Sequence, residues 1–189
     1  MLFRSLEHTF CETLLRELPA ATLLGALAER QQADGSLAPW AAGEASPESA
    51  TRRGLTYLDA LGLMDHRVPE RAVDFLAGRQ ASDGGWGEPA LPAELRIPVT
   101  GETAGLLAQT PFARESLLAR AEAFLARCYS PDLLQRGDYA PLLAYTHALA
   151  NVASEIADEA LVWCGRELEK GFRGRRFSAL QVARVMMRA

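Results

Sequence analysis

The chain has 189 residues, with 20 basic and 24 acidic side chains and a formal net charge of −4. This length is typical of one domain that buries about 70% of the surface of its unfolded chain, so we expect a single domain over residues 1–189. The mild acidity, without a basic stripe, argues against a nucleic-acid-binding groove and excludes nucleic acid as an expected partner.

Helix-forming residues dominate the chain, and their apolar members recur at helical spacing. Capping serines precede prolines at Ser46 and Ser130, as at the starts of many helices. The pattern predicts eight helices, over residues 9–32, 47–63, 68–80, 101–110, 113–128, 138–152, 154–171 and 178–188. We therefore expect an all-α protein of about four αα-hairpins.

A repeat of 49 residues supports the hairpins. At this offset Gln31 aligns with Gln80, and Asp34 with Asp83. Residues 75–83 align in the same way with residues 124–132, where Phe, Leu, Ala and Asp coincide. A period near 50 residues with two helices per unit is typical of stacked αα-hairpins.

One segment of the repeat carries a recognisable motif. Residues 80–86 read QASDGGW, and residues 31–37 read QQADGSL, a partial copy. The first segment matches Q-x-x-D-G-G-W and resembles the QW motif of squalene–hopene cyclases and the related prenyltransferase β-subunits, members of the terpenoid cyclase superfamily. The resemblance implies a partial α/α toroid whose inner helices enclose an apolar cavity for an isoprenoid chain.

The resemblance also implies a structural role for the motif residues. A glutamine amide can tie a loop to a helix end, an aspartate can accept backbone N–H bonds, and glycines admit a positive φ. A tryptophan ring can hold such a loop against the next helix. The residues concerned are Gln31, Asp34, Gly35, Gln80, Asp83, Gly84, Gly85 and Trp86.

The chain lacks the catalytic motifs of the families that it resembles. There is no D-x-D-D, with which the cyclases protonate a double bond. The prenyltransferases use zinc, but here Cys11, Cys128 and Cys164 lie far apart, and the histidines are equally scattered. We expect no metal and no cofactor. The odd number of cysteines, without a CxxC pair, indicates reduced thiols in a cytoplasmic protein.

Several polar or aromatic residues on the expected inner helices remain as candidates. For catalysis these are Glu102, Tyr145 and His147, and for ligand binding Thr103, Tyr139 and Thr146. A histidine among alanines and leucines is more often a core residue, but in a cavity its pKa would suit proton transfer. Glu102, at the start of the helix expected over 101–110, is more typical of a residue that complements the helix dipole.

Two functions fit these observations. In the first, the protein binds a small hydrophobic isoprenoid-like molecule in an apolar concave cavity. It could also transform this molecule, as a cyclase or transferase. Alternatively, it is a non-catalytic scaffold or protein-interaction module that pairs through its open ring. A roomy apolar pocket would favour the first function and a flat exposed apolar patch the second.

The terminal repeats also predict self-association. An incomplete ring leaves apolar end faces, and two-fold assembly is the commonest way to cover them. We expect a homodimer or a partner protein at one or both ends, and no transmembrane segment. The apolar residues at the two ends are Leu2, Phe3 and Leu6, and Val182, Val185, Met186 and Met187.

Overall fold

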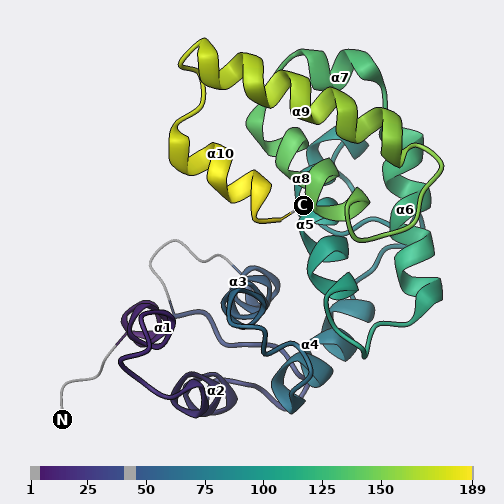
Figure 1. Ribbon diagram of the computed structural model, residues 1–189. Helices are drawn as coiled ribbons and strands as arrows, with labels where there is room; N and C mark the ends of the chain where they lie inside the picture. The colour runs from purple at the N-terminus through teal and green to yellow at the C-terminus, as the bar shows by residue number, and fades with distance from the viewer. Residues whose placement is uncertain (1–4, 41–45, 189) are drawn as a thin grey trace. The chain divides into compact units, whose positions relative to one another are not determined.

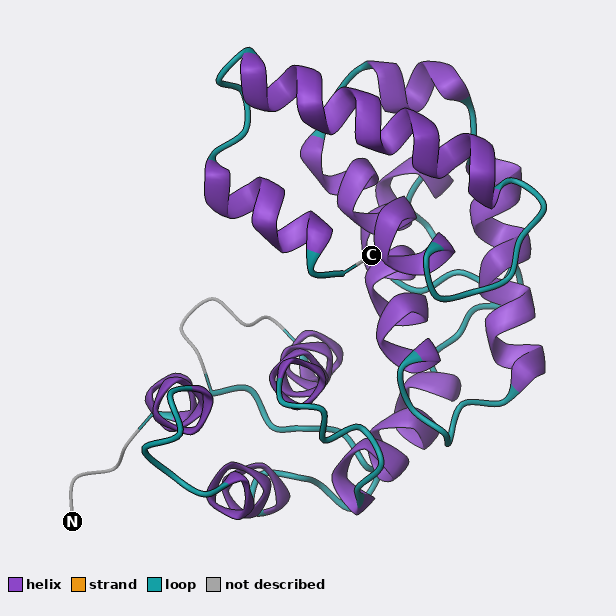
Figure 2. Cartoon of the chain, viewed as in Figure 1, coloured by secondary structure: helices purple, strands orange, loops and turns teal. Residues whose placement is uncertain are grey.

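The computed structural model describes residues 5–40 and 46–188. Over these residues it contains ten helices and no strand, only one isolated bridge between Gln31 and Leu37 (Figure 2). The helices are α1 (Leu6–Leu14), α2 (Ala20–Ala28), α3 (Pro47–Ala60), α4 (Arg67–Ala77), α5 (Ala93–Ala108), α6 (Glu115–Cys128), α7 (Pro131–Gln135), α8 (Tyr139–Leu149), α9 (Ala157–Arg173) and α10 (Ala179–Met186). The predicted all-α class is confirmed. None of the helices in the described ranges is long and apolar enough to cross a membrane.

The chain divides into two compact units. The first comprises residues 1–79 with 110–112, and the second residues 80–109 with 113–189. In the first unit α1 packs on α2 and α3 on α4; in the second, α5 packs on α6 and α8 on α9. Each unit thus consists of packed helix pairs, although α1 and α2 correspond to the single helix predicted over residues 9–32. Helix α10 corresponds to the helix predicted over 178–188, and α7 was not predicted. Closure of the hairpins into a partial toroid stays a prediction.

Two predicted helix boundaries are wrong. The helix predicted over residues 9–32 is interrupted between α1 and α2, where Arg16 has a φ of 62°, a left-handed conformation that ends a helix. The helix predicted over 101–110 begins eight residues earlier, at Ala93, because α5 accommodates Pro98 in its interior. Glu102 therefore lies in the middle of α5, and its predicted place at a helix N-terminus is wrong.

Residues 80–86 form a turn that connects α4 to α5 and contacts α6. Gln80 Nε2 donates to the carbonyl oxygens of Gly84, at 2.9 Å, and Leu117 in the first turn of α6, at 3.0 Å. Asp83 Oδ1 accepts the backbone N–H of Gly85 at 3.1 Å. The glutamine thus joins the turn to α6, as its amide chemistry allows.

Residues 31–37 form the same turn in the first unit. Gln31 Nε2 donates to the carbonyl oxygens of Gly35 and Val68, at 3.0 and 2.9 Å, and Asp34 Oδ1 accepts the N–H of Ser36 at 3.0 Å. Gly35 has a φ of 90°, against 91° for Gly84. The two copies that lie 49 residues apart therefore share their hydrogen bonds as well as their sequence pattern. Asp132, which aligns with Asp83, lies instead in α7, so the third repeat does not contain this turn.

The two turns differ in the partner of their aspartate. The guanidinium of Arg96, only 3% exposed, binds both carboxylate oxygens of Asp83 at 2.6 and 3.0 Å and lies over the ring of Phe124. This pairing, opposed by partial desolvation and assisted by the Gly85 N–H, lowers the pKa of Asp83. In the first turn the Ser36 hydroxyl is the corresponding partner, at 2.7 Å, and lowers the pKa of Asp34.

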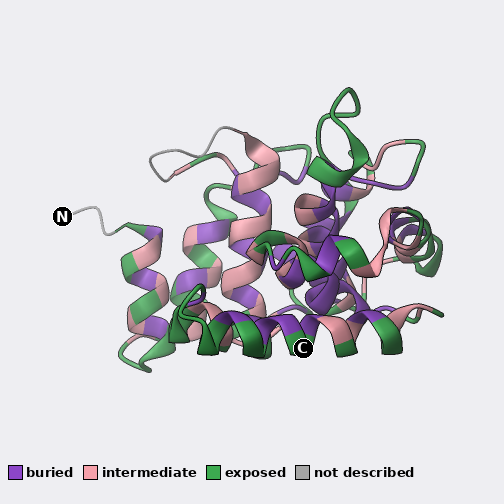
Figure 3. Cartoon of the chain, turned by 90° about the horizontal axis from the view of Figure 1, so that it is seen from above, coloured by how far each residue is buried: buried purple, intermediate pink, exposed green. Residues whose placement is uncertain are grey.

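Glycines on α5 allow α8 to approach closely. A Cβ added at Gly101 would overlap Ala144 of α8, and one added at Gly105 would overlap the ring of His147. Gly101 and Gly105 are four residues apart and so lie on one face of α5. Most residues of α8 are buried, and Figure 3 shows buried and exposed segments alternating along the helices.

Candidate functional site

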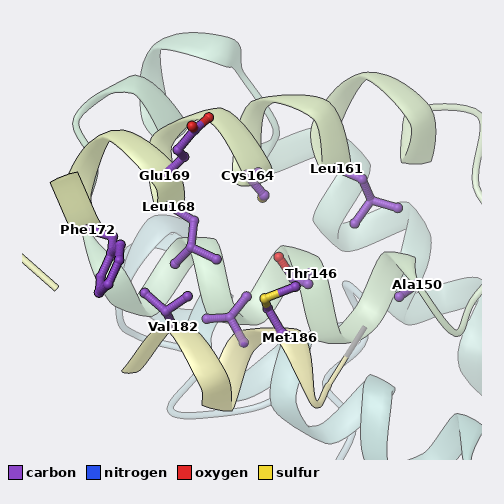
Figure 4. A pocket seen from close by; sticks show the side chains of 11 residues that line it. Thr146, Ala150, Leu161, Cys164, Leu168, Glu169, Phe172, Val182 and Met186 are labelled. Atoms are coloured by element: carbon purple, nitrogen blue, oxygen red, sulfur yellow. The ribbon is translucent and has the colours of Figure 1, made fainter. Parts of the chain in front are cut away.

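The last three helices of the second unit form a pocket of about 690 Å³. Helices α8, α9 and α10 lie beside one another (Figure 1), and side chains from all three point into the space between them (Figure 4). We call this space the α8–α10 pocket. Its walls are mainly aliphatic and aromatic, with Leu161, Leu168 and Phe172 from α9 and Val182, Val185 and Met186 from α10.

Contacts at both ends hold α10 across the pocket. At its start, Ser178 and Gln181 form a capping box, and the Tyr139 hydroxyl donates to the carbonyl of Gln181 at 3.2 Å. Just beyond its end, Asn151 Nδ2 donates to the carbonyl of Arg188 at 3.2 Å. Tyr139 at the start of α8 and Asn151 in the turn after α8 thus bind the two ends of α10. These hydrogen bonds hold α10 in place, so the pocket that it borders is a fixed feature of the second unit.

Polar groups in the pocket wall are few. Thr146 is 5% exposed and presents its hydroxyl from α8 (Figure 4). The Cys164 thiol lies opposite on α9; burial raises its pKa to about 11, an effect that the Thr146 hydroxyl partly opposes. The thiol is therefore neutral at physiological pH. Glu169 is exposed and forms an ion pair with Arg173, 2.5 Å between oxygen and nitrogen.

The chemistry of this wall suits binding of an apolar molecule. A pocket of 300–1,000 Å³ with apolar walls and few polar groups is typical of sites for small molecules. A thiol protonated at neutral pH is a poor nucleophile. Over residues 5–40 and 46–188, no three His, Cys, Asp or Glu side chains are grouped so that they could hold a metal ion.

Of the three residues expected to bind a ligand, Thr146 lines the α8–α10 pocket. Thr103 is fully buried in α5, where its hydroxyl donates to the carbonyl of Val99 at 2.7 Å. Tyr139 lies at the start of α8, and its ring makes an edge-to-face contact with Phe177, with 5.6 Å between the ring centroids. Its hydroxyl donates to the carbonyl of Gln181 in α10. Tyr139 thus supports the pocket from outside its wall.

The three catalytic candidates do not line this pocket. Tyr145 is fully buried and donates to the carbonyl of Leu125 at 3.0 Å, and burial raises its pKa well above the usual value. His147, 2% exposed, packs against Gly105, and burial lowers its pKa to about 3. Glu102 is partly exposed on α5. Both buried side chains are therefore neutral near pH 7.

The sequence interpretation missed Cys164, Leu168 and Phe172 as pocket residues. They recur at spacings of four on α9, a helix with one apolar and one charged face. That pattern predicts a packed face. What it cannot reveal is that α10 covers the face incompletely and leaves a pocket.

Comparison with known proteins identifies no relative: no family model matches the chain, and neither a curated protein nor a solved structure matches it at a significant level. The resemblance to terpenoid cyclases and prenyltransferase β-subunits therefore depends on the motif residues alone.

Proposed function

We propose that the protein binds a small hydrophobic, isoprenoid-like molecule in the α8–α10 pocket. The observation that carries the proposal is the apolar space of about 690 Å³ between three helices, the last of which is anchored at both ends. Burial of apolar ligand surface against these walls supplies the binding free energy. The motif resemblance supports a ligand of this kind, since the enzymes concerned hold isoprenoid chains in apolar cavities.

Binding without chemical transformation is the version that the pocket supports best. A cyclase or transferase needs an acid, a nucleophile or a metal at the reacting atoms. The described residues of the wall include two ionisable side chains: Cys164, which is neutral, and Glu169, which is exposed and paired with Arg173. We therefore propose a binding or carrier protein.

A pair of glycine variants tests this proposal. Gly165 lines the pocket from the middle of α9, and a Cβ added there would meet no atom within 4 Å. Gly25, in the middle of α2, is exposed like Gly165 and is also unobstructed, but it lies in the first unit. Replacing either glycine in a helix removes a poor helix former, so neither variant should lose stability.

The measurement is binding of the neutral dye Nile red by fluorescence titration. We expect Gly165→Phe to weaken dye binding by at least about tenfold, because the ring occupies the ligand's space. Gly25→Phe should bind the dye like the wild type. If Gly165→Phe also binds like the wild type, or if the wild type binds no dye, the proposal is wrong.

A second function, self-association, is favoured by a separate observation. Three apolar side chains at α10 are mostly exposed: Leu180 at 78% and Met186 at 69% within the helix, and Met187 at 76% directly after it. Exposed apolar side chains on one short helix are typical of a contact surface, and methionine adapts to varied partners. The occupant that we propose for this surface is a second copy of the chain.

A further inference from the structure

We infer that the ligand of the α8–α10 pocket carries one uncharged hydrogen-bonding group, a hydroxyl or a carbonyl, which pairs with the Thr146 hydroxyl. This inference rests on the proposed function and specifies the class of ligand. It excludes plain hydrocarbons as the best ligands, and also carboxylates, phosphates and amines.

The first argument is the hydrogen bonding of Thr146. Its Oγ1 is buried and has no hydrogen-bond partner of normal geometry among the described residues. Three other buried threonines on helices satisfy their hydroxyl on the carbonyl four residues earlier: Thr103 at 2.7 Å, Thr51 at 2.7 Å and Thr13 at 2.8 Å. That bond is the usual one for threonine within a helix. Thr146 forgoes it.

The second argument is the direction of the hydroxyl. Figure 4 shows the Thr146 oxygen pointing away from α8, toward the space that Cys164 and Leu168 border from α9. A thiol is only a weak donor and a weak acceptor. The Cys164 thiol is therefore a poor substitute for an oxygen partner, and a buried hydroxyl without a good partner is unfavourable. A ligand oxygen would remove this penalty.

The third argument is charge. Among the residues that the structure describes, no buried charged side chain lines the pocket, so a charged ligand group would lose its hydration without gaining a counter-ion. The Glu169 carboxylate in the wall repels an anionic group, and its pairing with Arg173 makes it a weak partner for a cation. Thr146, which can both donate and accept, suits an alcohol or a ketone equally.

The test uses four ten-carbon compounds, decane, decan-1-ol, 2-decanone and decanoate, in competition with Nile red at pH 7.5. Thr146→Val removes the hydroxyl with little change of shape. It should weaken decan-1-ol and 2-decanone by about 3- to 10-fold, the value of one hydrogen bond, and leave decane unchanged or tighter. Thr146→Ser should keep the wild-type preference for the alcohol and the ketone. Decanoate should bind the wild type at least about tenfold more weakly than decan-1-ol.

Thr103→Val is the matched control, because this threonine is buried on α5 and bonded within its own helix. It should change none of the four affinities, and a melting curve of each variant confirms that it is folded. If Thr146→Val weakens all four compounds alike, or none, the inference is wrong while the pocket assignment stands. If the wild type binds none of the four, the proposed function fails with it.

Discussion

Trp86 is 2% exposed, and its backbone N–H donates to the Thr100 hydroxyl at 3.0 Å. Its ring is among the largest fully buried side chains of the described residues. We predict that Trp86→Ala lowers the free energy of unfolding by about 3–5 kcal/mol, the usual cost of deleting a buried aromatic ring. Urea denaturation provides the measurement.

Trp40 is the control for this experiment. It is only partly buried, and its indole N–H donates to Glu7 at 2.9 Å. Trp40→Ala should therefore cost less than Trp86→Ala. A loss below about 1 kcal/mol for Trp86→Ala would contradict the account of the turn.

His147 should make the stability of the protein depend on pH. Burial, with Arg188 and Arg184 nearby, lowers its pKa from 6.5 to about 3. Below pH 6.5 the unfolded chain takes up a proton that the folded chain does not accept. The contribution is therefore complete above pH 6.5 and is lost progressively as the pH falls toward 3. At pH 5 the folded state should be about 2 kcal/mol less stable than at pH 7.5 from this group alone.

Denaturation of the wild type and of His147→Gln at both pH values isolates the effect. The variant should lose less stability than the wild type between pH 7.5 and pH 5, because glutamine does not titrate. His66, which is exposed, is the matched control, and His66→Gln should behave like the wild type. An unchanged pH dependence in His147→Gln would show that the histidine is not held neutral.

At the scale of the elements, the turn at residues 80–86 should tolerate no Cβ at Gly84. This residue has a φ of 91°, and an added Cβ would overlap the carbonyl oxygen of Arg120. Gly62 also has a positive φ, 67°, but a Cβ there would meet nothing within 4 Å. Gly62→Ala should thus cost only the conformational strain, about 1–2 kcal/mol, and Gly84→Ala more than about 3 kcal/mol. Equal losses in urea denaturation would mean that α6 does not contact the turn closely.

The turns were accessible to sequence reasoning because their information is local. Gln80, Asp83 and Gly84 lie within five residues, and the same spacing recurs 49 residues earlier. The start of α5 was not accessible, because Pro98 indicates a helix boundary and only tertiary packing keeps it inside a helix. The break after α1 was missed for the opposite reason, since Leu14, Leu15 and Leu18 continue the helical spacing across it.

The candidate site was accessible only in part. Thr146 is a candidate because it is a polar residue on a mostly apolar helix, and it does line the pocket. The same criterion applies to Tyr145 and His147, yet their side chains contact α6 and α5. Which side of α8 each residue occupies follows from helical periodicity, but which neighbour covers that side depends on tertiary packing.

At the scale of the whole molecule, only some of the apolar end residues from which the homodimer was predicted are exposed to a partner. Leu6 and Val185 are buried, at 3% exposure each, and so are not available to a partner, while Leu2 and Phe3 lie outside the described residues. Val182 and Met186 line the α8–α10 pocket, whereas Met187, at 76% exposure, does not. A substitution at Met187 therefore tests the dimer surface without changing the pocket wall.

We predict that the wild type sediments as a dimer at micromolar concentration and that Met187→Asp sediments as a monomer, because a buried unpaired charge is unfavourable. Sedimentation equilibrium is the measurement. A wild type that is wholly monomeric would refute the dimer, and a dimer that survives Met187→Asp would refute this surface as its interface.

The central claim is that a hydrophobic molecule occupies the α8–α10 pocket, and native mass spectrometry with identification of the released molecule tests it most directly. Wild type, Gly165→Phe and Gly25→Phe are each incubated with decan-1-ol and compared. The account predicts one bound molecule per chain in the wild type and in Gly25→Phe, and none in Gly165→Phe, because Gly165 lines the pocket and the added ring takes up space that the ligand needs. An unloaded wild type, or a Gly165→Phe variant loaded to the same extent, would contradict it.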